Sequence, residues 1–186
     1  MTTTLTDLLA MNHAELATTL RAGYPIAWGE LLGYAYRGTS LGLPALLERL
    51  TWKTFCKVFV DDPSRGPRGY NVRVHQRGPG AATHPRRGSG GTPVTFGHYS
   101  VVDAASIVTA WGPTNGVILD YAPGAGMLDP LSFVRDPLVS LRDGSGEFLL
   151  GATYLALGLP VRTPAFFALE REGGATEIAT PPRWRA

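Results

Sequence analysis

The two lysines of this chain are the residues whose type and spacing point most directly to chemistry. All but two of its 17 cationic side chains are arginine, and both lysines, Lys53 and Lys57, lie in one apolar segment. An ammonium group on a flexible stem suits a point contact with a carboxylate or phosphate, or amine chemistry such as Schiff-base formation. The alternative is a solvated edge strand, where lysine discourages pairing with other strands.

A predicted β-hairpin, with strands at 53–60 and 70–76 around a turn at 61–69, would position both lysines. Side chains alternate between the two faces of a strand, so one face of this hairpin combines cations with aromatic rings. Its members are Lys53, Phe55, Lys57 and Phe59 on the first strand and Asn71, Arg73 and His75 on the second. Phenylalanines on a solvated face would be exposed to water, so we expect this face to line a cavity or a covered interface.

His98 and Asp120 form a candidate acid–base pair. Strict alternation over a predicted strand at 94–102 places His98 on the same face as Phe96, and Asp120 lies in a short predicted strand at 117–121. Imidazole titrates near neutral pH, and a carboxylate can hold it in one tautomer. The alternative is a half-buried histidine that hydrogen-bonds to the backbone. A buried Asp120 needs a cationic partner, for which the candidates are Lys53, Lys57 and Arg73.

One serine motif also matches a catalytic pattern. Gly38-Thr39-Ser40-Leu41-Gly42 fits G-x-S-x-G and precedes a short predicted helix at 43–50, as a nucleophile elbow would. The chain lacks the strand–helix alternation of an α/β-hydrolase and has no histidine after Asp120, so we interpret the match as chance. Four histidines without close spacing, and one cysteine at Cys56, predict no metal site and no internal disulfide.

The composition indicates a single domain with one hydrophobic core. The chain has 186 residues, 44% of them hydrophobic, and its net charge of +2 comes without the dense basic stripe of a nucleic-acid-binding protein. The first residues lack the pattern of a signal peptide, and no apolar run is long enough to span a membrane. We therefore predict a cytoplasmic protein, and no sequence motif indicates a cofactor.

The order of the predicted elements favours a mainly β fold. Residues 1–23 predict two short helices, the second of which begins at a capping box between Asn12 and Glu15. Closely spaced strands fill residues 28–171, interrupted by a flexible glycine- and proline-rich loop at 77–93, and a loose tail follows at 172–186. The predicted fold is an antiparallel barrel of about seven to nine strands, which has no exposed edges; a bent α+β sheet is the alternative.

Four short segments carry a family resemblance. They are Gly33-Tyr34-Ala35-Tyr36-Arg37-Gly38, Trp52-Lys53-Thr54-Phe55, Leu119-Asp120-Tyr121-Ala122-Pro123 with Asp129 after it, and Phe166-Phe167-Ala168-Leu169-Glu170-Arg171. Over residues 28–171 they resemble the GxWxG-domain proteins and, more distantly, the nitrobindin, fatty-acid-binding and lipocalin barrels. The resemblance implies a calycin-like barrel that binds a hydrophobic small molecule, with Arg171 packed on an aromatic ring of the first strand. Haem is not expected, because no histidine lies near the C-terminal strands.

Three functions fit these features. The first is a barrel that binds a hydrophobic small molecule, with or without an anionic head, and its predicted ligand-binding residues are Lys53, Phe55, Lys57, Arg73, His98 and Tyr121. The second is a small-barrel isomerase, dehydratase or cyclase in which His98 and Asp120 act as acid and base. The third is an interaction module that uses the loop at 77–93 and the N-terminal helices.

Overall fold

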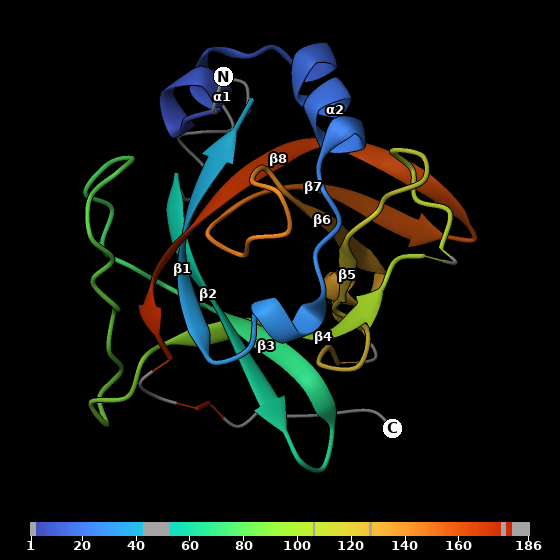
Figure 1. Cartoon of the computed structure of the whole chain (residues 1–186). Coiled ribbons are helices and arrows are strands. Elements are labelled where there is room, and N and C mark those ends of the chain that lie inside the picture. The colour runs from blue at the N-terminus through green and yellow to red at the C-terminus, as the bar shows by residue number, and fades with distance from the viewer. Residues whose placement is uncertain (1–2, 43–52, 106, 127, 176–177, 180–186) are drawn as a thin grey trace.

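Eight antiparallel strands form a closed barrel (Figure 1). The computed structural model describes residues 3–42, 53–105, 107–126, 128–175 and 178–179. The elements are α1 (Leu5–Ala10), α2 (His13–Ala22), η1 (Trp28–Glu30), β1 (Tyr34–Leu41), β2 (Thr54–Asp62), β3 (Gly66–Val72), β4 (Thr95–Asp103), β5 (Val117–Asp120), η2 (Pro130–Phe133), β6 (Val134–Ser140), β7 (Phe148–Leu157) and β8 (Leu159–Gly174). Each strand pairs with the next, and β8 pairs with β1. The predicted barrel is confirmed, and its closure excludes the bent open sheet.

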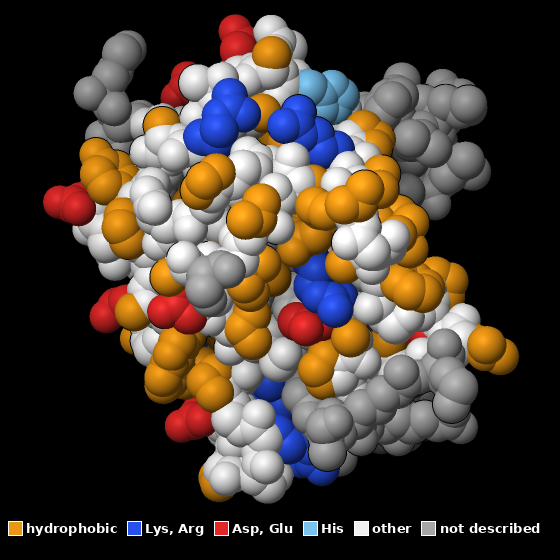
Figure 2. All heavy atoms as spheres, turned by 90° about the vertical axis from the view of Figure 1, so that its right-hand side faces the viewer, with side chains coloured by type: hydrophobic (Ala, Val, Ile, Leu, Met, Phe, Trp, Pro, Cys, Tyr) orange, Lys and Arg blue, Asp and Glu red, His pale blue; other side chains and the backbone are white. Residues whose placement is uncertain are grey.

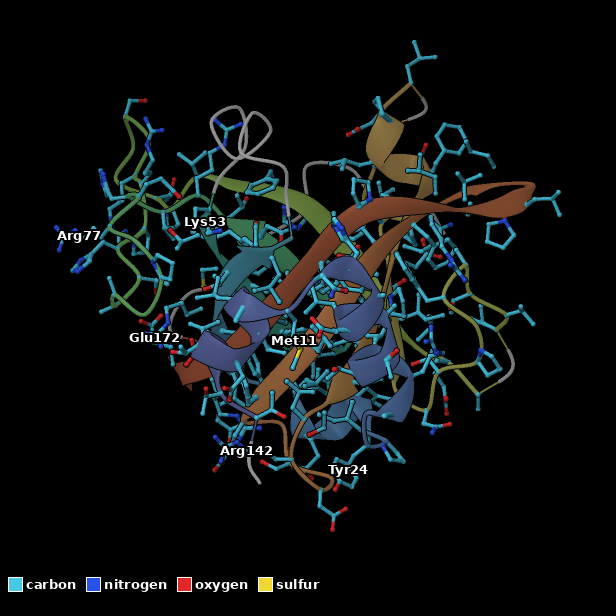
Figure 3. The ribbon with its side chains drawn as sticks, turned by 90° about the horizontal axis from the view of Figure 1, so that it is seen from above. Met11, Tyr24, Lys53, Arg77, Arg142 and Glu172 are labelled. Carbon is cyan, nitrogen blue, oxygen red and sulfur yellow. The ribbon has the colours of Figure 1, made fainter. Side chains whose placement is uncertain are left out.

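The two N-terminal helices cover the outside of the barrel. Both begin at capping boxes, formed by Thr4 with Asp7 and, as predicted, by Asn12 with Glu15. Their apolar sides meet the outer faces of β6, β7 and β8 in one buried cluster, where Leu16 packs together with Phe166. Seen from above, the helices lie across these strands (Figure 3). Helices this short gain their stability from such packing.

Arg171 stabilises the pairing of β8 with β1 that closes the barrel. Its guanidinium lies 4.0 Å from the ring centroid of Tyr34. It also donates hydrogen bonds to Tyr36 Oη at 3.3 Å and to the Glu30 carbonyl oxygen at 2.6 Å. Because these partners lie on β1 and η1 while Arg171 lies on β8, the contacts join both ends of the described barrel sequence. The packing of Arg171 on an aromatic ring of the first strand is confirmed.

Inward-facing glycines let aromatic rings lie flat inside the barrel. A Cβ added at Gly38 would lie 2.2 Å from the Phe55 ring, and one added at Gly151 would lie 2.2 Å from the Phe167 ring. At the end where β1 begins, rings pack edge to face with centroids 5.3 to 5.7 Å apart, in the order Tyr36, Phe59, Tyr99 and Tyr121. Leu31, directly after η1, is buried in the same cluster. This half of the barrel is therefore a packed core, and a cavity lies toward the other end.

The outer face of β2 and β3 forms a third buried cluster, made by Cys56, Val58, Val60, Tyr70, Val72 and Val74. The segment 77–93 lies over this side of the barrel and is attached by backbone hydrogen bonds from His75 N to the His84 oxygen and from Arg86 N to the Arg73 oxygen, both 2.9 Å or shorter. A cavity of about 480 Å³ lies between this segment, the β2–β3 face and the end of β8. Burial, with a smaller contribution from Glu172, raises the pKa of the Cys56 thiol to about 12, so Cys56 behaves as an apolar core residue.

Several predicted boundaries need correction. Residues 28–30 form a short 3-10 helix rather than the start of a strand, and the chain enters β1 after Gly33, whose φ of +80° suits glycine. The hairpin turn is shorter than the predicted 61–69, because β2 continues to Asp62 and β3 resumes at Gly66. The last strand continues past residue 171 to Gly174, so residues 172–174 of the predicted tail belong to β8. The predicted helix at 43–50 lies outside the described residues.

The outer surface mixes residue types. On the face in Figure 2, single charged side chains are dispersed among hydrophobic ones, and no continuous basic stripe crosses the part of that face that the structure describes. Among the described helices, none has both the length and the apolar character needed to cross a membrane.

Candidate functional site

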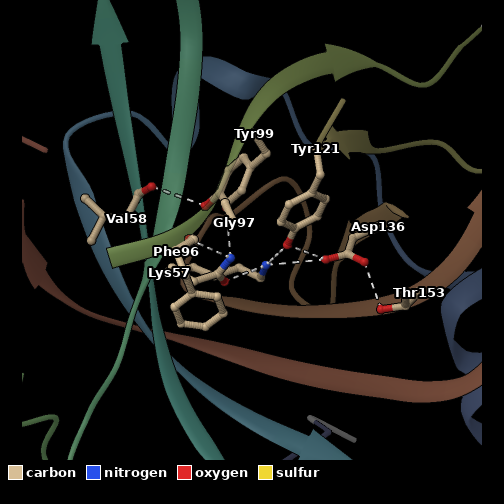
Figure 4. Close-up of polar contacts among 9 residues, drawn as sticks. Lys57, Val58, Phe96, Gly97, Tyr99, Tyr121, Asp136 and Thr153 are labelled. Atoms are coloured by element: carbon tan, nitrogen blue, oxygen red, sulfur yellow. Dashed lines mark hydrogen bonds and ion pairs between the residues drawn. The ribbon is translucent and has the colours of Figure 1, made fainter. Parts of the chain in front are cut away.

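An ion pair with hydrogen-bonded neighbours lies inside the barrel (Figure 4). The Lys57 ammonium donates to Asn71 Oδ1 at 3.0 Å, to Tyr121 Oη at 2.5 Å and to Asp136 Oδ2 at 3.3 Å. The Tyr121 hydroxyl in turn donates to Asp136 Oδ2 at 2.8 Å, and Thr153 Oγ1 donates to Asp136 Oδ1 at 2.8 Å. Every proton of the ammonium and both carboxylate oxygens therefore have a partner.

Strand pairing brings these five residues together from five places in the chain. Lys57 on β2 lies directly opposite Asn71 on β3. Tyr121 follows the last residue of β5, and Asp136 lies on the neighbouring strand β6. Thr153 occurs on β7 at a register shift between Ala152 and Tyr154. Lys57, Asn71 and Thr153 alternate with residues of the outer clusters, and all five side chains line a cavity in the barrel interior.

Burial dominates the electrostatics of this network. The side chains of Lys57 and Asp136 are 3% and 5% exposed, respectively. Burial lowers the pKa of the Lys57 ammonium below its usual value, and the negative charge of Asp136 opposes that shift. Burial, reinforced by the charge of Asp136, also raises the pKa of the Tyr121 phenol far above its usual value. Tyr121 is therefore a neutral hydrogen-bond donor that bridges the amine and the carboxylate.

A cavity of about 280 Å³ adjoins the network at the end of the barrel where β1 ends and β2 begins. The apolar part of its wall is formed by Phe55, Phe96, Leu131, Val134, Phe166 and Phe167. Lys57, Asn71, Tyr121, Asp136 and Thr153 form the polar part, together with Ser40. An apolar chamber with polar groups gathered on one side is typical of a small-molecule site.

A β-bulge at Gly97 shapes this wall. On β4, Tyr99 pairs with Gly69 but Phe96 pairs with Asn71, so β4 holds one residue more than β3 in this interval. Gly97 has φ of +51°, and an added Cβ would lie 2.9 Å from Asn71 Nδ2. That amide donates to the Gly97 carbonyl oxygen at 3.0 Å, which turns Asn71 Oδ1 toward Lys57. The bulge therefore orients the amide that accepts from the lysine.

Of the predicted ligand-binding residues, Phe55, Lys57 and Tyr121 meet at this cavity. Lys53, at the start of the same strand, is half-buried and does not contribute to the lining. Arg73 follows the end of β3, is exposed, and places its guanidinium 5.8 Å from the ring centroid of Phe96. The mixed face predicted for the hairpin thus lines a cavity at Phe55, Lys57 and Asn71. It reaches the surface at Arg73 and His75 and is buried in the aromatic core at Phe59.

His98 and Asp120 both lie on the outside of the barrel and do not contact each other. The bulge at Gly97 interrupts strict alternation, so Phe96 and Tyr99 face inward while His98 packs outward on Tyr70, with ring centroids 5.4 Å apart. Asp120 alternates with inward residues of β5 and forms an ion pair with Arg135 Nη2 at 3.1 Å. The cation that pairs with Asp120 is therefore Arg135 rather than Lys53, Lys57 or Arg73.

His98 provides a pH-dependent prediction. Burial, with a smaller contribution from Arg68, lowers its pKa from about 6.5 to about 4. Below pH 6.5 the unfolded chain binds a proton that the folded chain excludes, so stability should fall as pH drops from about 6.5 to about 4. The loss should be on the order of 2 kcal/mol once solvent screening is considered. Urea unfolding of wild type and His98→Phe across this range should show a smaller loss in the variant; equal slopes would contradict the assignment.

Asn71, Asp136 and Thr153 are site residues that the sequence interpretation did not select. Asp136 has a recognisable signal, because Val134, Asp136 and Leu138 alternate along one face of β6. Pro137 masked that alternation, since proline normally argues against a central strand.

Ser40 lies within β1 rather than at a strand-to-helix turn, so it lacks the strained geometry of a nucleophile elbow. Among the described residues, no three His, Cys, Asp or Glu side chains gather as metal ligands.

Comparisons with known proteins found no similarity from which a function could be inferred. No protein-family model matches the chain, and searches of curated proteins and of solved structures also found no match. The closed eight-stranded barrel is compatible with a ligand-binding fold of the calycin kind.

Proposed function

We propose that this protein binds a small, mostly apolar molecule that carries one uncharged polar group. The observation that carries the proposal is the cavity of about 280 Å³, whose phenylalanine-rich wall faces one hydrogen-bonding network. The apolar body of the ligand would lie against Phe55, Phe96 and Phe167. Its polar group would lie near Lys57, Asn71 and Tyr121, which fix its orientation.

Charge balance favours an uncharged head over an anionic one. Among the described residues that line the cavity, Lys57 and Asp136 are the charged side chains, and they already neutralise each other. A carboxylate ligand would add a second negative charge near Asp136 in a buried space, where an uncompensated charge is costly. The other predicted head-group cations, Lys53 and Arg73, do not line the cavity. A hydroxyl or carbonyl group can exchange hydrogen bonds with the network without this cost.

The size of the cavity sets a second condition on the ligand. Its volume is just below the range of about 300–1,000 Å³ that is usual for drug-sized ligands. A single ring with a short polar chain therefore fits better than a long acyl chain.

We also propose that the chain is a member of the GxWxG and nitrobindin-like barrels. The closed barrel and the packing of Arg171 on Tyr34 support this proposal.

Calorimetric titration with two probes of one skeleton tests the proposal. Hydrocinnamyl alcohol should bind about tenfold or more tightly than hydrocinnamate, because one buried charge costs at least 1.4 kcal/mol. Ala165→Phe, which places a large side chain in the lined space, should weaken binding of the alcohol by about tenfold or more, while Ala165→Ser should retain it.

One further measurement complements the titration. Mass spectrometry of an organic extract of the purified protein, with a denatured blank, should find a compact neutral compound if the natural ligand copurifies. Tighter binding of hydrocinnamate than of the alcohol would reject the uncharged head. Binding of the alcohol that Ala165→Phe leaves unchanged would move the site outside the barrel.

A further inference from the structure

We infer that Lys57 captures an aldehyde or ketone as a covalent iminium inside the barrel. The inference rests on the proposed function, because it names the polar group of the ligand and the bond that it forms. Reversible Schiff-base formation needs an amine that has little contact with bulk water but is accessible to the ligand, a nearby proton acceptor and a counter-ion for the resulting cation. The Lys57 network supplies each of these.

The first requirement is an amine with access to a ligand. Lys57 is almost fully buried, yet it lines the 280 Å³ cavity. The chain has one other lysine, Lys53, which lies outside that lining. A carbonyl compound in the cavity would therefore meet a single primary amine, held in place by three hydrogen bonds.

The second requirement is a route for the proton that must leave before the amine can attack. Asp136 Oδ2 lies 3.3 Å from Lys57 Nζ and accepts directly. Tyr121 offers a second route, because its oxygen accepts from Lys57 while its own proton points to Asp136 Oδ2 at 2.8 Å. The lowered pKa of the buried lysine favours this transfer, and the neutral amine then attacks the carbonyl carbon.

The overall step balances without any further reactant. The lysine ammonium and the carbonyl compound form an iminium and one molecule of water. The new carbon–nitrogen double bond replaces the carbon–oxygen double bond, and the two protons that nitrogen loses leave with the carbonyl oxygen as water. The positive charge stays on nitrogen throughout the net reaction, so the ion pair with Asp136 persists in the product.

The third requirement is stabilisation of the product cation. The nitrogen of Lys57 lies 5.0 Å from the ring centroid of Tyr99, 5.2 Å from that of Tyr121 and 5.1 Å from that of Phe167. Aromatic faces attract a cation in a desolvated site, and an iminium is a cation of this kind. Its remaining N–H still has Asp136 Oδ2 as an acceptor within reach. The same surroundings thus suit the amine before the reaction and the iminium after it.

Reductive trapping tests the inference on the full chain. Hydrocinnamaldehyde is mixed with the protein in the presence of cyanoborohydride, which reduces the iminium to a stable secondary amine. The intact mass should rise by that of one aldehyde less one oxygen atom, and tandem mass spectrometry should place the addition on Lys57. Labelling at Lys57 should exceed that at Lys53 by about tenfold or more in the folded protein. In urea-unfolded protein the two lysines should react equally.

Two variants keep the test independent of folding defects. Lys53→Arg should be trapped like the wild type. Lys57→Arg keeps a cation beside Asp136 but cannot form an iminium, so its trapping should vanish while circular dichroism confirms the fold. If wild type binds hydrocinnamyl alcohol but the aldehyde is not trapped at Lys57, or is trapped equally at Lys53, the covalent inference fails and the binding function stands. If neither compound binds, the binding function itself fails.

Discussion

Replacing Lys57 with methionine should lower the free energy of unfolding by about 3–5 kcal/mol, because it leaves the Asp136 carboxylate buried without a counter-ion. Methionine has a similar length and conserves packing, so the lost charge accounts for most of the effect. Asp136 also loses one of the donors to its Oδ2 atom, and only Tyr121 remains there. Urea denaturation at neutral pH measures the change.

A double-mutant cycle separates charge from packing. Asp136→Asn keeps acceptor and donor positions for Thr153 and Tyr121 but removes the charge, so Lys57→Met with Asp136→Asn should be more stable than Lys57→Met alone. We expect a coupling energy of about 2–3 kcal/mol between the two residues. Strict additivity of the two single changes would show that the ion pair contributes no coupling.

The adjacent residues offer a matched control on the outside of the barrel. Arg135 pairs with Asp120 at 3.1 Å, and their side chains are 18% and 26% exposed. The cycle of Arg135→Met with Asp120→Asn should give a coupling of less than about 1 kcal/mol, since water screens exposed pairs. The comparison tests burial as the cause, because each pair has one member on β6 and the two members, Arg135 and Asp136, are adjacent in the chain.

Gly151→Ala should cost about 2–3 kcal/mol and should also weaken hydrocinnamyl alcohol by about tenfold. The added Cβ would lie 2.2 Å from Phe167 Cζ, so the ring must move. Phe167 packs against Phe55, with centroids 5.9 Å apart, and both rings line the cavity. A displaced ring therefore takes space from the ligand. Thermal unfolding and calorimetric titration measure the two effects.

A second glycine and a second substitution provide the controls. Gly173, on β8, has no heavy atom within 4 Å of an added Cβ, so Gly173→Ala should be neutral or slightly stabilising. Phe167→Leu in the Gly151→Ala background should recover part of the lost stability, because a smaller side chain removes the overlap. If the two changes destabilise additively, the ring is not the source of the strain.

The sequence alone identified a large part of the architecture and some of the site. Alternation in residues 53–60 placed Phe55 and Lys57 on one covered face, and the structure confirms that both line a cavity. Local signals such as the capping box at Asn12 act within one turn of chain, so they can be recognised without the fold. Tyr121, one of the predicted ligand-binding residues, also lines that cavity. These inferences depend on contacts between near neighbours and on strand period.

The partners across the barrel could not be derived in that way. Lys57 and Asp136 are 79 residues apart, and their contact depends on the register of the intervening strands and on closure. A single extra residue at Gly97 moved His98 from the predicted inner face to the outer one. The pairing of Asp120 with Arg135 likewise follows from the β5–β6 register.

The sequence by itself therefore determined that this chain forms antiparallel strands with a mixed cationic and aromatic face, because side-chain alternation and turn chemistry are local properties. Only the tertiary structure decided which charges meet. Closing the sheet removes Lys57 and Asp136 from water together, and the cost of burying either charge alone makes their contact a condition of the fold. The cavity beside that pair arises from the same closure, and with it the chemistry that we propose.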